Sequence, residues 1–221
     1  MGRKPPHSTG PFPRSLTMLS AQQIVVLHDR KTRAGHDPLS GPQPDEDSSW
    51  LALVTAQHRA NFELWHIEDE ARTPGATDAE LAAVKRRVDS TNQRRNDLAE
   101  QLDRLLLAHL EPQRLPNPAA PLHSESPGLI IDRLSILALK IYHTREEAER
   151  PDAPEGHALR NRERLAILEE QRTDLAACLD QLWRETMAGT RRFKLYRQLK
   201  MYNDPSLNPA VYRKLVKEQG R

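Results

Sequence analysis

The chain has 221 residues, enough for one domain with a hydrophobic core, and its formal net charge is only +2. That balance argues against a general nucleic-acid-binding protein, which normally carries a clear excess of cationic side chains. Charged residues make up 29% of the chain and aromatic residues 5%, a composition that favours long helices with solvated faces over β-sandwiches.

Cysteine content and hydropathy indicate the cellular compartment in which the protein is expected. The single cysteine, Cys178, excludes an internal disulfide and a cage of thiolate metal ligands, which is typical of a reducing compartment. No apolar run reaches the length of a membrane span, because Asp132 and Arg133 interrupt the longest one. We therefore expect a cytoplasmic protein without a membrane-spanning helix.

The N-terminal half of the chain predicts a disordered arm and three helices. Residues 1–18 are basic and rich in proline, and we expect them to form the arm. A capping signal at Ser20 starts a short first helix, and a second helix is expected over residues 49–72, where Thr-Pro-Gly ends it. Thr77 and a glutamate three residues later form a capping box. The leucine and valine spacing behind them predicts a long third helix to about residue 110.

The C-terminal half predicts two further long helices after a proline-rich linker. Pro127 suits the first position of a fourth helix, which ends near residue 149 and is the most apolar in the chain. A fifth, charged helix is expected over residues 155–187. Segment 189–221 is basic, and it predicts a short helix and a tail that dock on the bundle core of residues 19–188.

Together these elements predict an all-α fold, a helical bundle. The third and fifth helices carry long leucine seams and are expected to form a long antiparallel pair. The fourth helix is apolar on two sides, which indicates a central position in the bundle. Long helices with such seams are also compatible with a homodimer.

Polar side chains occur on helix faces that the apolar residues turn toward the interior. A rotation of about 100° per residue places them in ribbons on the second, third and fourth helices. Burial of so many polar groups is unfavourable unless each finds a partner. The residues of these ribbons include His58, Asn61, Trp65, Glu68, Arg72, Asn92, Arg95, Asp132, Arg133, Lys140 and His143.

Two explanations fit these ribbons. In the first, they form a structural network in which Glu68 and Asp132 pair with arginines. In the second, they line a pocket between helices whose cations hold an anionic ligand. The pocket hypothesis assigns the anion to Arg72, Arg95, Arg133 and Lys140, hydroxyl orientation to Glu68 or Asp132, proton exchange to His143, and further ligand contacts to His58, Asn61, Trp65 and Asn92.

Signals for a metal or cofactor are weak. His66 and Asp69 are three residues apart, a spacing that can share an ion, but His66 points away from the polar ribbon. Glu100 and Asp103 have the same spacing, and helical rotation places them on the solvent side, where an ion pair with Arg104 explains them. The chain contains no Gly-rich phosphate loop and no hydrolase signature. We therefore predict no dedicated metal site and no cofactor.

Four segments of the sequence occur together in a characteristic order. They are H-R-A-N-F-E-L-W-H-I-E-D-E-A-R from His58, N-Q-R-R-N-D from Asn92, S-P-G-L-I-I-D-R-L-S-I-L-A-L-K-I-Y-H from Ser126 and Y-R-Q-L-K-M-Y-N-D-P-S-L-N-P from Tyr196. Over about residues 20–209 the chain resembles a bacterial family catalogued as domain of unknown function 4254, although Ser126 stands where threonine is expected. Genes of this family often lie near glycosyltransferases of surface-polysaccharide assembly, and the resemblance therefore implies a link to glycan building by association.

The preferred functional hypothesis is an interhelical pocket that binds an anionic small molecule, a sugar nucleotide or sugar phosphate, in support of surface-glycan assembly. One alternative is a non-enzymatic scaffold that docks a glycosyltransferase through the basic segment 189–221. A weaker alternative is a magnesium-dependent helical nucleotide pyrophosphohydrolase. That chemistry requires inward carboxylates, whereas the inward charges here are mostly cationic. The sequence leaves open whether the protein is an enzyme.

Overall fold

The computed structural model describes residues 19–37, 49–199, 206–209 and 213, so the predicted arm at 1–18 lies outside the described residues. The helices are α1 (Ala21–His36), α2 (Ser49–Glu70), α3 (Asp78–Leu110), the short 3₁₀ helix η1 (Glu111–Gln113), α4 (Pro127–Glu149) and α5 (His157–Met187). Within the described ranges there is no strand, only a single β-bridge between Leu122 and Arg192. The predicted all-α helical bundle is confirmed. None of the described helices is long and apolar enough to cross a membrane.

Local capping accounts for the ends of several helices. Thr77 accepts a hydrogen bond from the backbone of Glu80, and the Glu80 carboxylate accepts one from the Thr77 backbone, so the predicted capping box starts α3. Ser20 caps α1 by accepting from the backbone N–H of Gln23. Gly189, at φ 70°, follows α5 in the left-handed conformation that glycine adopts without strain.

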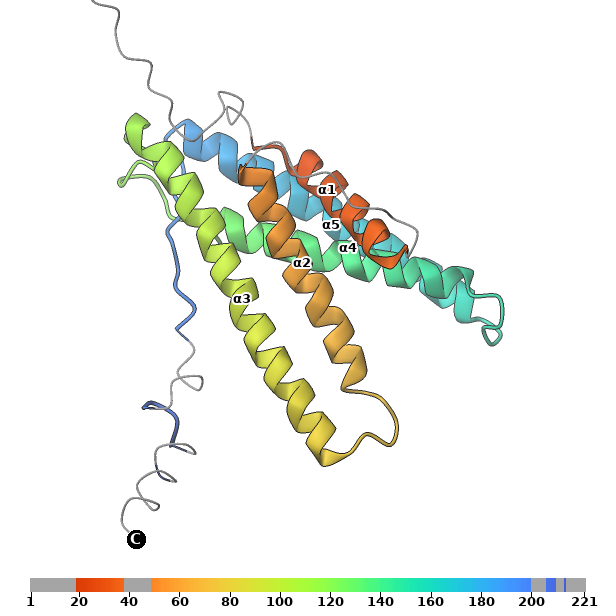
Figure 1. The fold of residues 1–221 in the computed structure, drawn as a ribbon. Helices are drawn as coiled ribbons and strands as arrows, with labels where there is room; N and C mark the ends of the chain where they lie inside the picture. The colour runs from red at the N-terminus through yellow and green to blue at the C-terminus, as the bar shows by residue number, and fades with distance from the viewer. Residues whose placement is uncertain (1–18, 38–48, 200–205, 210–212, 214–221) are drawn as a thin grey trace, which may run out of the picture.

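α4 is the central helix, as its two apolar sides predict. It packs against each of the other four α-helices. Its Ile130, Ile131 and Leu134 side chains are almost completely buried in the core. Figure 1 shows α4 running across α2 and α3, with α5 alongside it.

The long helices pair with their neighbours in sequence. α2 with α3 and α4 with α5 form two helical hairpins (Figure 1), whereas α3 and α5 do not form the predicted pair. The short connections at residues 71–77 and 150–156 reverse the chain, and each helix therefore packs against the one before it. The leucine seam of α3 is buried, but its partners are α2 and α4.

α3 and α4 approach closely at Gly128. Asp103 on α3 is buried, which corrects the predicted solvent exposure, and its carboxylate accepts hydrogen bonds from the Gly128 N–H (2.7 Å) and the Ser126 hydroxyl. It thus caps the N-terminus of α4 from a neighbouring helix, where the helix dipole favours negative charge. Burial raises the pKa of Asp103 to about 6. A Cβ at position 128 would overlap the carbonyl oxygen of Ala99, so only glycine fits.

The chain after α5 is extended. Residues 191–199 contain no helix, which corrects the prediction of a short basic helix in this segment. The Arg192 N–H donates to the Pro121 carbonyl (3.0 Å), and its own carbonyl accepts from the His123 N–H (2.8 Å). Phe193 is buried in the core. These contacts with distant parts of the chain outweigh the local helical preference.

Candidate functional site

A buried polar network is centred on Asp132 of α4. Its Oδ1 accepts hydrogen bonds from the side-chain amides of Gln57 (2.5 Å) and Asn61 (2.9 Å) on α2. The Nε of Arg95 on α3 lies 3.6 Å from the same oxygen, which is an ion pair without a hydrogen bond. Burial raises the pKa of Asp132, and the charge of Arg95 and the two amides oppose this effect. The carboxylate therefore joins three helices and is held by partners within the protein.

The network continues through His58 to α1. His58 is buried, with Nε2 at 3.0 Å from the Thr32 hydroxyl and Nδ1 at 2.8 Å from the Ser135 hydroxyl. Asn61 also donates to Ser135 (3.0 Å), and the His28 ring stacks on His58 with 4.7 Å between centroids. Hydrogen bonds therefore join this half of the predicted ribbon, although both ring nitrogens of His28 are buried without a hydrogen-bond partner among the described residues.

The buried histidines make the stability of the fold depend on pH. Burial lowers the pKa of His58 to about 4 from an ordinary value of 6.5. It also lowers the pKa of His28, together with the nearby His58 and Arg172. Between pH 6.5 and 4 the unfolded chain binds a proton that folded His58 does not, so the free energy of unfolding falls as the pH is lowered through this window. Asp103 acts in the opposite direction, because its raised pKa lets the folded state bind a proton below about pH 6.

Comparison with His58→Asn measures the share of His58 together with its effect on the neighbouring His28. We expect the wild-type protein to lose about 3 kcal/mol more unfolding free energy than the variant between pH 6.5 and 4, because the pKa difference spans about 2.5 units. Urea unfolding at a series of pH values measures this difference. The same pH dependence in both proteins would contradict the assignment.

A cleft of about 380 Å³ adjoins the network between α2, α3 and α4. Arg95 reaches into it half-buried, and its buried Nε has no hydrogen-bond partner among the described residues. Glu68 and Arg72 form an ion pair (3.4 Å) at the exposed side of the cleft. The residues that line the cleft are Asn61, Leu64, Trp65, Glu68, Asp69, Arg72, Arg95, Ile136 and Leu139.

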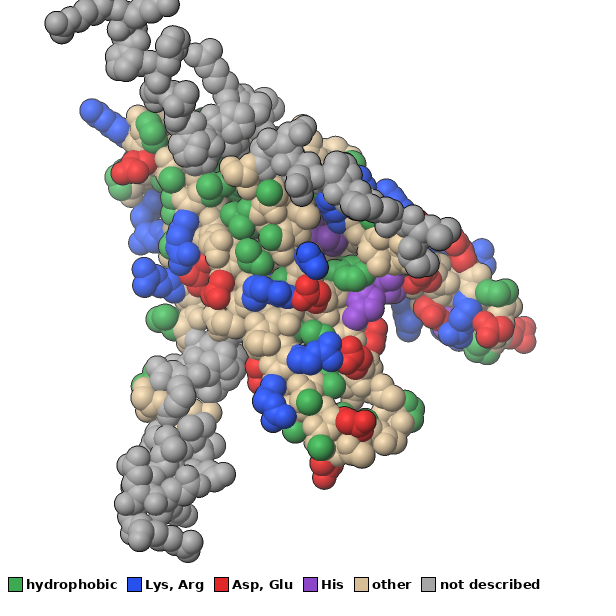
Figure 2. Space-filling view, viewed as in Figure 1, with side chains coloured by type: hydrophobic (Ala, Val, Ile, Leu, Met, Phe, Trp, Pro, Cys, Tyr) green, Lys and Arg blue, Asp and Glu red, His purple; other side chains and the backbone are tan. Residues whose placement is uncertain are grey.

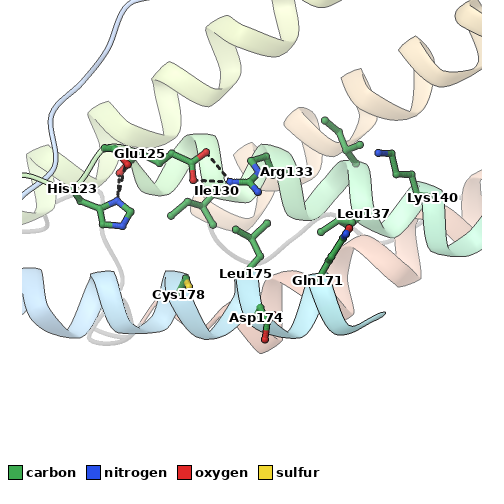
Figure 3. Close-up of a pocket in the computed structure, with 12 residues that line it drawn as sticks. His123, Glu125, Ile130, Arg133, Leu137, Lys140, Gln171, Asp174, Leu175 and Cys178 are labelled. Carbon is green, nitrogen blue, oxygen red and sulfur yellow. Dashed lines mark hydrogen bonds and ion pairs between the residues drawn. The ribbon is translucent and has the colours of Figure 1, made fainter. Parts of the chain in front are cut away.

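Arg133 and Lys140 lie in a different cavity. This second space, about 640 Å³, lies between α4 and α5, and Figure 3 shows both side chains at its edge. Arg133 is more than half exposed and pairs with Glu125 (2.8 Å). The four predicted cations therefore do not converge, because the other two line the cleft on another face of α4. Asn92 on α3 lines neither of these two cavities.

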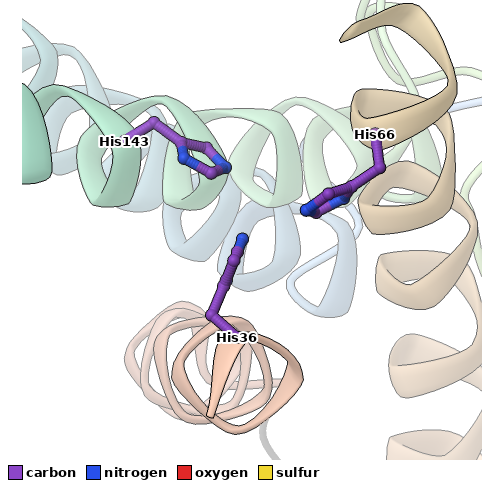
Figure 4. Close-up of side chains that lie close together, drawn as sticks. All are labelled: His36, His66 and His143. Carbon is purple, nitrogen blue, oxygen red and sulfur yellow. The ribbon is translucent and has the colours of Figure 1, made fainter. Parts of the chain in front are cut away.

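His143 belongs to a cluster of three histidines from distant parts of the sequence. His36 at the end of α1, His66 on α2 and His143 on α4 point their ring tips toward one another (Figure 4). One ring nitrogen of each lies within 4.8 Å of the others. Each Nδ1 has a hydrogen-bond partner one turn away, namely the Thr32 carbonyl (2.8 Å), the Phe62 carbonyl (2.8 Å) and the Glu146 carboxylate (2.9 Å).

Aromatic rings surround this cluster and connect it with the cleft. Trp65 stacks on His143 with 4.8 Å between centroids and also lines the cleft, and Tyr142 stacks on His36 at 4.4 Å. Burial lowers the pKa of His143, while its hydrogen bond to Glu146 opposes the shift. Because His66 faces away from the polar ribbon, helical periodicity predicts no metal-binding role for it. On that side His66 contacts His36, the last residue of α1. The two residues are far apart in the sequence, and periodicity within one helix does not predict a contact between them.

One family model matches residues 51–195 of the chain, and its description is "Protein of unknown function (DUF4254)". The matched range contains Asp132 with its partners on α2 and α3, the residues that line the cleft and two of the three clustered histidines, His66 and His143. Neither a curated protein nor a solved structure matches the chain. Because the family match spans well over half of the 221 residues, the chain belongs to the DUF4254 family.

Proposed function

We propose that the cleft between α2, α3 and α4 binds an anionic small molecule of the sugar phosphate or sugar nucleotide class, in support of surface-glycan assembly. The observation that carries the proposal is that the Arg95 guanidinium lines the cleft without a hydrogen-bond partner for its buried Nε among the described residues. Its guanidinium lines the cleft, lies 3.6 Å from Asp132 without a hydrogen bond, and has a buried Nε with no described partner. A planar guanidinium with free donors binds phosphate through two parallel hydrogen bonds.

The other side chains of the cleft suit the sugar part of such a ligand. Trp65 offers a flat apolar surface, and Glu68 and Asp69 offer carboxylate oxygens that accept hydrogen bonds from hydroxyl groups. Figure 2 shows basic and acidic side chains interspersed along α2 and α3, so this face has no patch of one sign. Selectivity for an anion therefore rests on the cleft interior.

The polar network behind the cleft holds Arg95 in place. Gln57 and Asn61 fix the Asp132 carboxylate, and that carboxylate fixes the guanidinium by its charge. A side chain that is already ordered loses less conformational entropy when a ligand binds. The two explanations of the polar ribbon are thus compatible. The structural network would account for its inner part, and the ligand pocket would account for its outer part.

Arg95→Gln is expected to remove the stabilisation that the ligand confers on the fold. The experiment is thermal unfolding of chelator-treated protein with uridine diphosphate glucose, glucose phosphate or inorganic phosphate. A ligand at a hundred times its dissociation constant adds about 2.7 kcal/mol to the unfolding free energy of the wild-type protein. Glutamine keeps a polar group beside Asp132 but lacks the charge that holds the anion.

Arg133→Gln is the matched control, because it removes an arginine from the other cavity. It should respond to each anion as the wild-type protein does. The proposal is wrong if none of the three anions stabilises the wild-type protein, or if the two variants lose the response equally.

The two alternative functions draw less support from the described residues. The group there that could hold a metal consists of histidines, whereas magnesium prefers carboxylate oxygens. The scaffold alternative depends on the segment 189–221, of which residues 191–199 are extended and most of the remainder lies outside the described ranges.

A further inference from the structure

We propose that His36, His66 and His143 form a binding site for one divalent transition-metal ion, with zinc as the expected ion. The three side chains come from α1, α2 and α4, and one ring nitrogen of each lies within 4.8 Å of the others (Figure 4). Trp65 stacks on His143 and also lines the anion pocket, but none of the three histidines lines that pocket, and neither proposal depends on the other.

Hydrogen bonds at Nδ1 set the tautomer of each ring. A carbonyl oxygen can only accept, so His36 and His66 donate their Nδ1–H to the backbone carbonyls one turn earlier (both 2.8 Å). The Nδ1 of His143 faces the Glu146 carboxylate at 2.9 Å. A neutral ring with its proton on Nδ1 presents a lone pair on Nε2. Metal-binding histidines show this arrangement, in which the second nitrogen donates to a carbonyl or a carboxylate.

The described residues leave these lone pairs without partners. The Nε2 atoms of His36 and His143 are buried and have no hydrogen-bond partner there. An unpaired buried polar atom costs free energy, and His58 by contrast has partners for both of its ring nitrogens. One cation at the centre of the cluster would bind all three lone pairs at once.

The ligand set favours zinc. Imidazole nitrogen binds zinc, copper, nickel and iron, whereas magnesium and calcium prefer oxygen. Zinc–nitrogen bonds of about 2.0 Å in tetrahedral geometry place the nitrogens about 3.3 Å apart. Zinc binding would therefore draw the three nitrogens, which lie up to 4.8 Å apart, closer together by rotation of the side chains. Three protein ligands leave a fourth position for water or an added ligand, as in catalytic zinc sites.

The stacked aromatic rings orient the cluster but do not explain its convergence. Tyr142 and Trp65 hold the ring planes of His36 and His143. Stacking alone sets no requirement on which nitrogen faces the centre. The hydrogen bonds at Nδ1 supply that selection, and together the two sets of contacts preorganise the ligands.

Cobalt and zinc titrations test the site in the full chain without a polyhistidine tag, after treatment with a chelator. We expect one equivalent of Co²⁺ to bind with the strong visible absorption of tetrahedral coordination, and zinc to displace it. Zinc should also raise the melting temperature, and chelator should reverse the rise. The proposal is overturned if the wild-type protein shows no saturable binding of either ion.

Single substitutions test whether the metal ion binds at the three histidines. His66 is only partly buried, and His66→Ala should weaken binding of Co²⁺ by more than about 100-fold, while Glu146→Ala should weaken it by about 10- to 100-fold through the lost hydrogen bond. His157→Ala is the matched control, since His157 on α5 pairs with Glu147 outside the cluster. It should bind as the wild-type protein does.

Circular dichroism and melting of each metal-free variant establish that it is folded, and His36→Gln at the end of α1 is a second ligand variant. Equal binding by His66→Ala, His36→Gln and His157→Ala would overturn the proposal. The anion experiment is carried out in chelator, so its failure and the failure of this one are distinguishable.

Discussion

Gly128→Ala is expected to lower the free energy of unfolding by about 3 kcal/mol. The added Cβ would overlap the backbone carbonyl oxygen of Ala99 and lie 2.9 Å from the Asp103 carboxyl group. A backbone atom cannot rotate away, so α4 must shift and weaken the hydrogen bond from the Gly128 N–H to Asp103. Urea unfolding measures the loss, and the melting temperature should fall by roughly 10 °C.

Gly35→Ala is the matched control for this substitution. Gly35 is also helical, but the atoms that a Cβ would meet there belong to the ring of Phe62, a side chain that can move. Alanine also has the higher helix propensity, by about 1 kcal/mol. We expect a change within about 1 kcal/mol at Gly35. A similar loss at both positions would show that the carbonyl oxygen of Ala99 does not restrict position 128.

Asp132→Ala is expected to cost about 3 kcal/mol or more of unfolding free energy. The substitution leaves the buried amides of Gln57 and Asn61 without their acceptor and the half-buried Arg95 without its counter-ion. An unpaired buried group loses its hydration without gaining a partner, and this penalty dominates the effect. Chemical denaturation at pH 7 measures it.

Asp97→Ala serves as the surface control on α3. Asp97 is exposed and accepts a hydrogen bond from Gln93 (2.9 Å), and its removal should change stability by less than about 0.5 kcal/mol. If Asp132→Ala were as harmless as Asp97→Ala, the network would contribute little to stability. Asp132 would then be better explained as a group that orients a ligand hydroxyl.

Much of the fold could be predicted because its signals are local. Capping residues mark the starts of α1 and α3, Pro127 marks the start of α4, and apolar periodicity marks the buried faces. The pairing of the long helices could not be predicted in this way. A leucine seam shows that a helix has a partner without showing which one, and the short connections decided the choice. The extended segment 191–199 depends on the burial of Phe193 and on pairing with the distant linker, which no local pattern encodes.

In the candidate site too, the contacts that depend on helical rotation could be predicted, whereas those that depend on tertiary packing could not. His58, Asn61 and Asp132 meet as the ribbons predict, because helical rotation puts each on an inward face. The ribbons did not reveal that Arg133 and Lys140 face α5, since α4 is covered by protein on several sides. His36 contacts His66 and His143 only because the end of α1 lies beside α2 and α4. A contact of this kind depends on tertiary packing, which periodicity within one helix does not report.

The position of α4 determines how the molecule loses its structure. Because α4 packs against all four other α-helices, neither helical hairpin keeps its core when α4 leaves. Amide hydrogens in the middle of α4 should therefore exchange with solvent only when the whole bundle opens. The tip of the α2–α3 hairpin, over residues 71–90, is mostly exposed, and its amides can exchange through local fraying. We therefore expect the core of the bundle to unfold as one cooperative unit, while the distant hairpin tip opens independently.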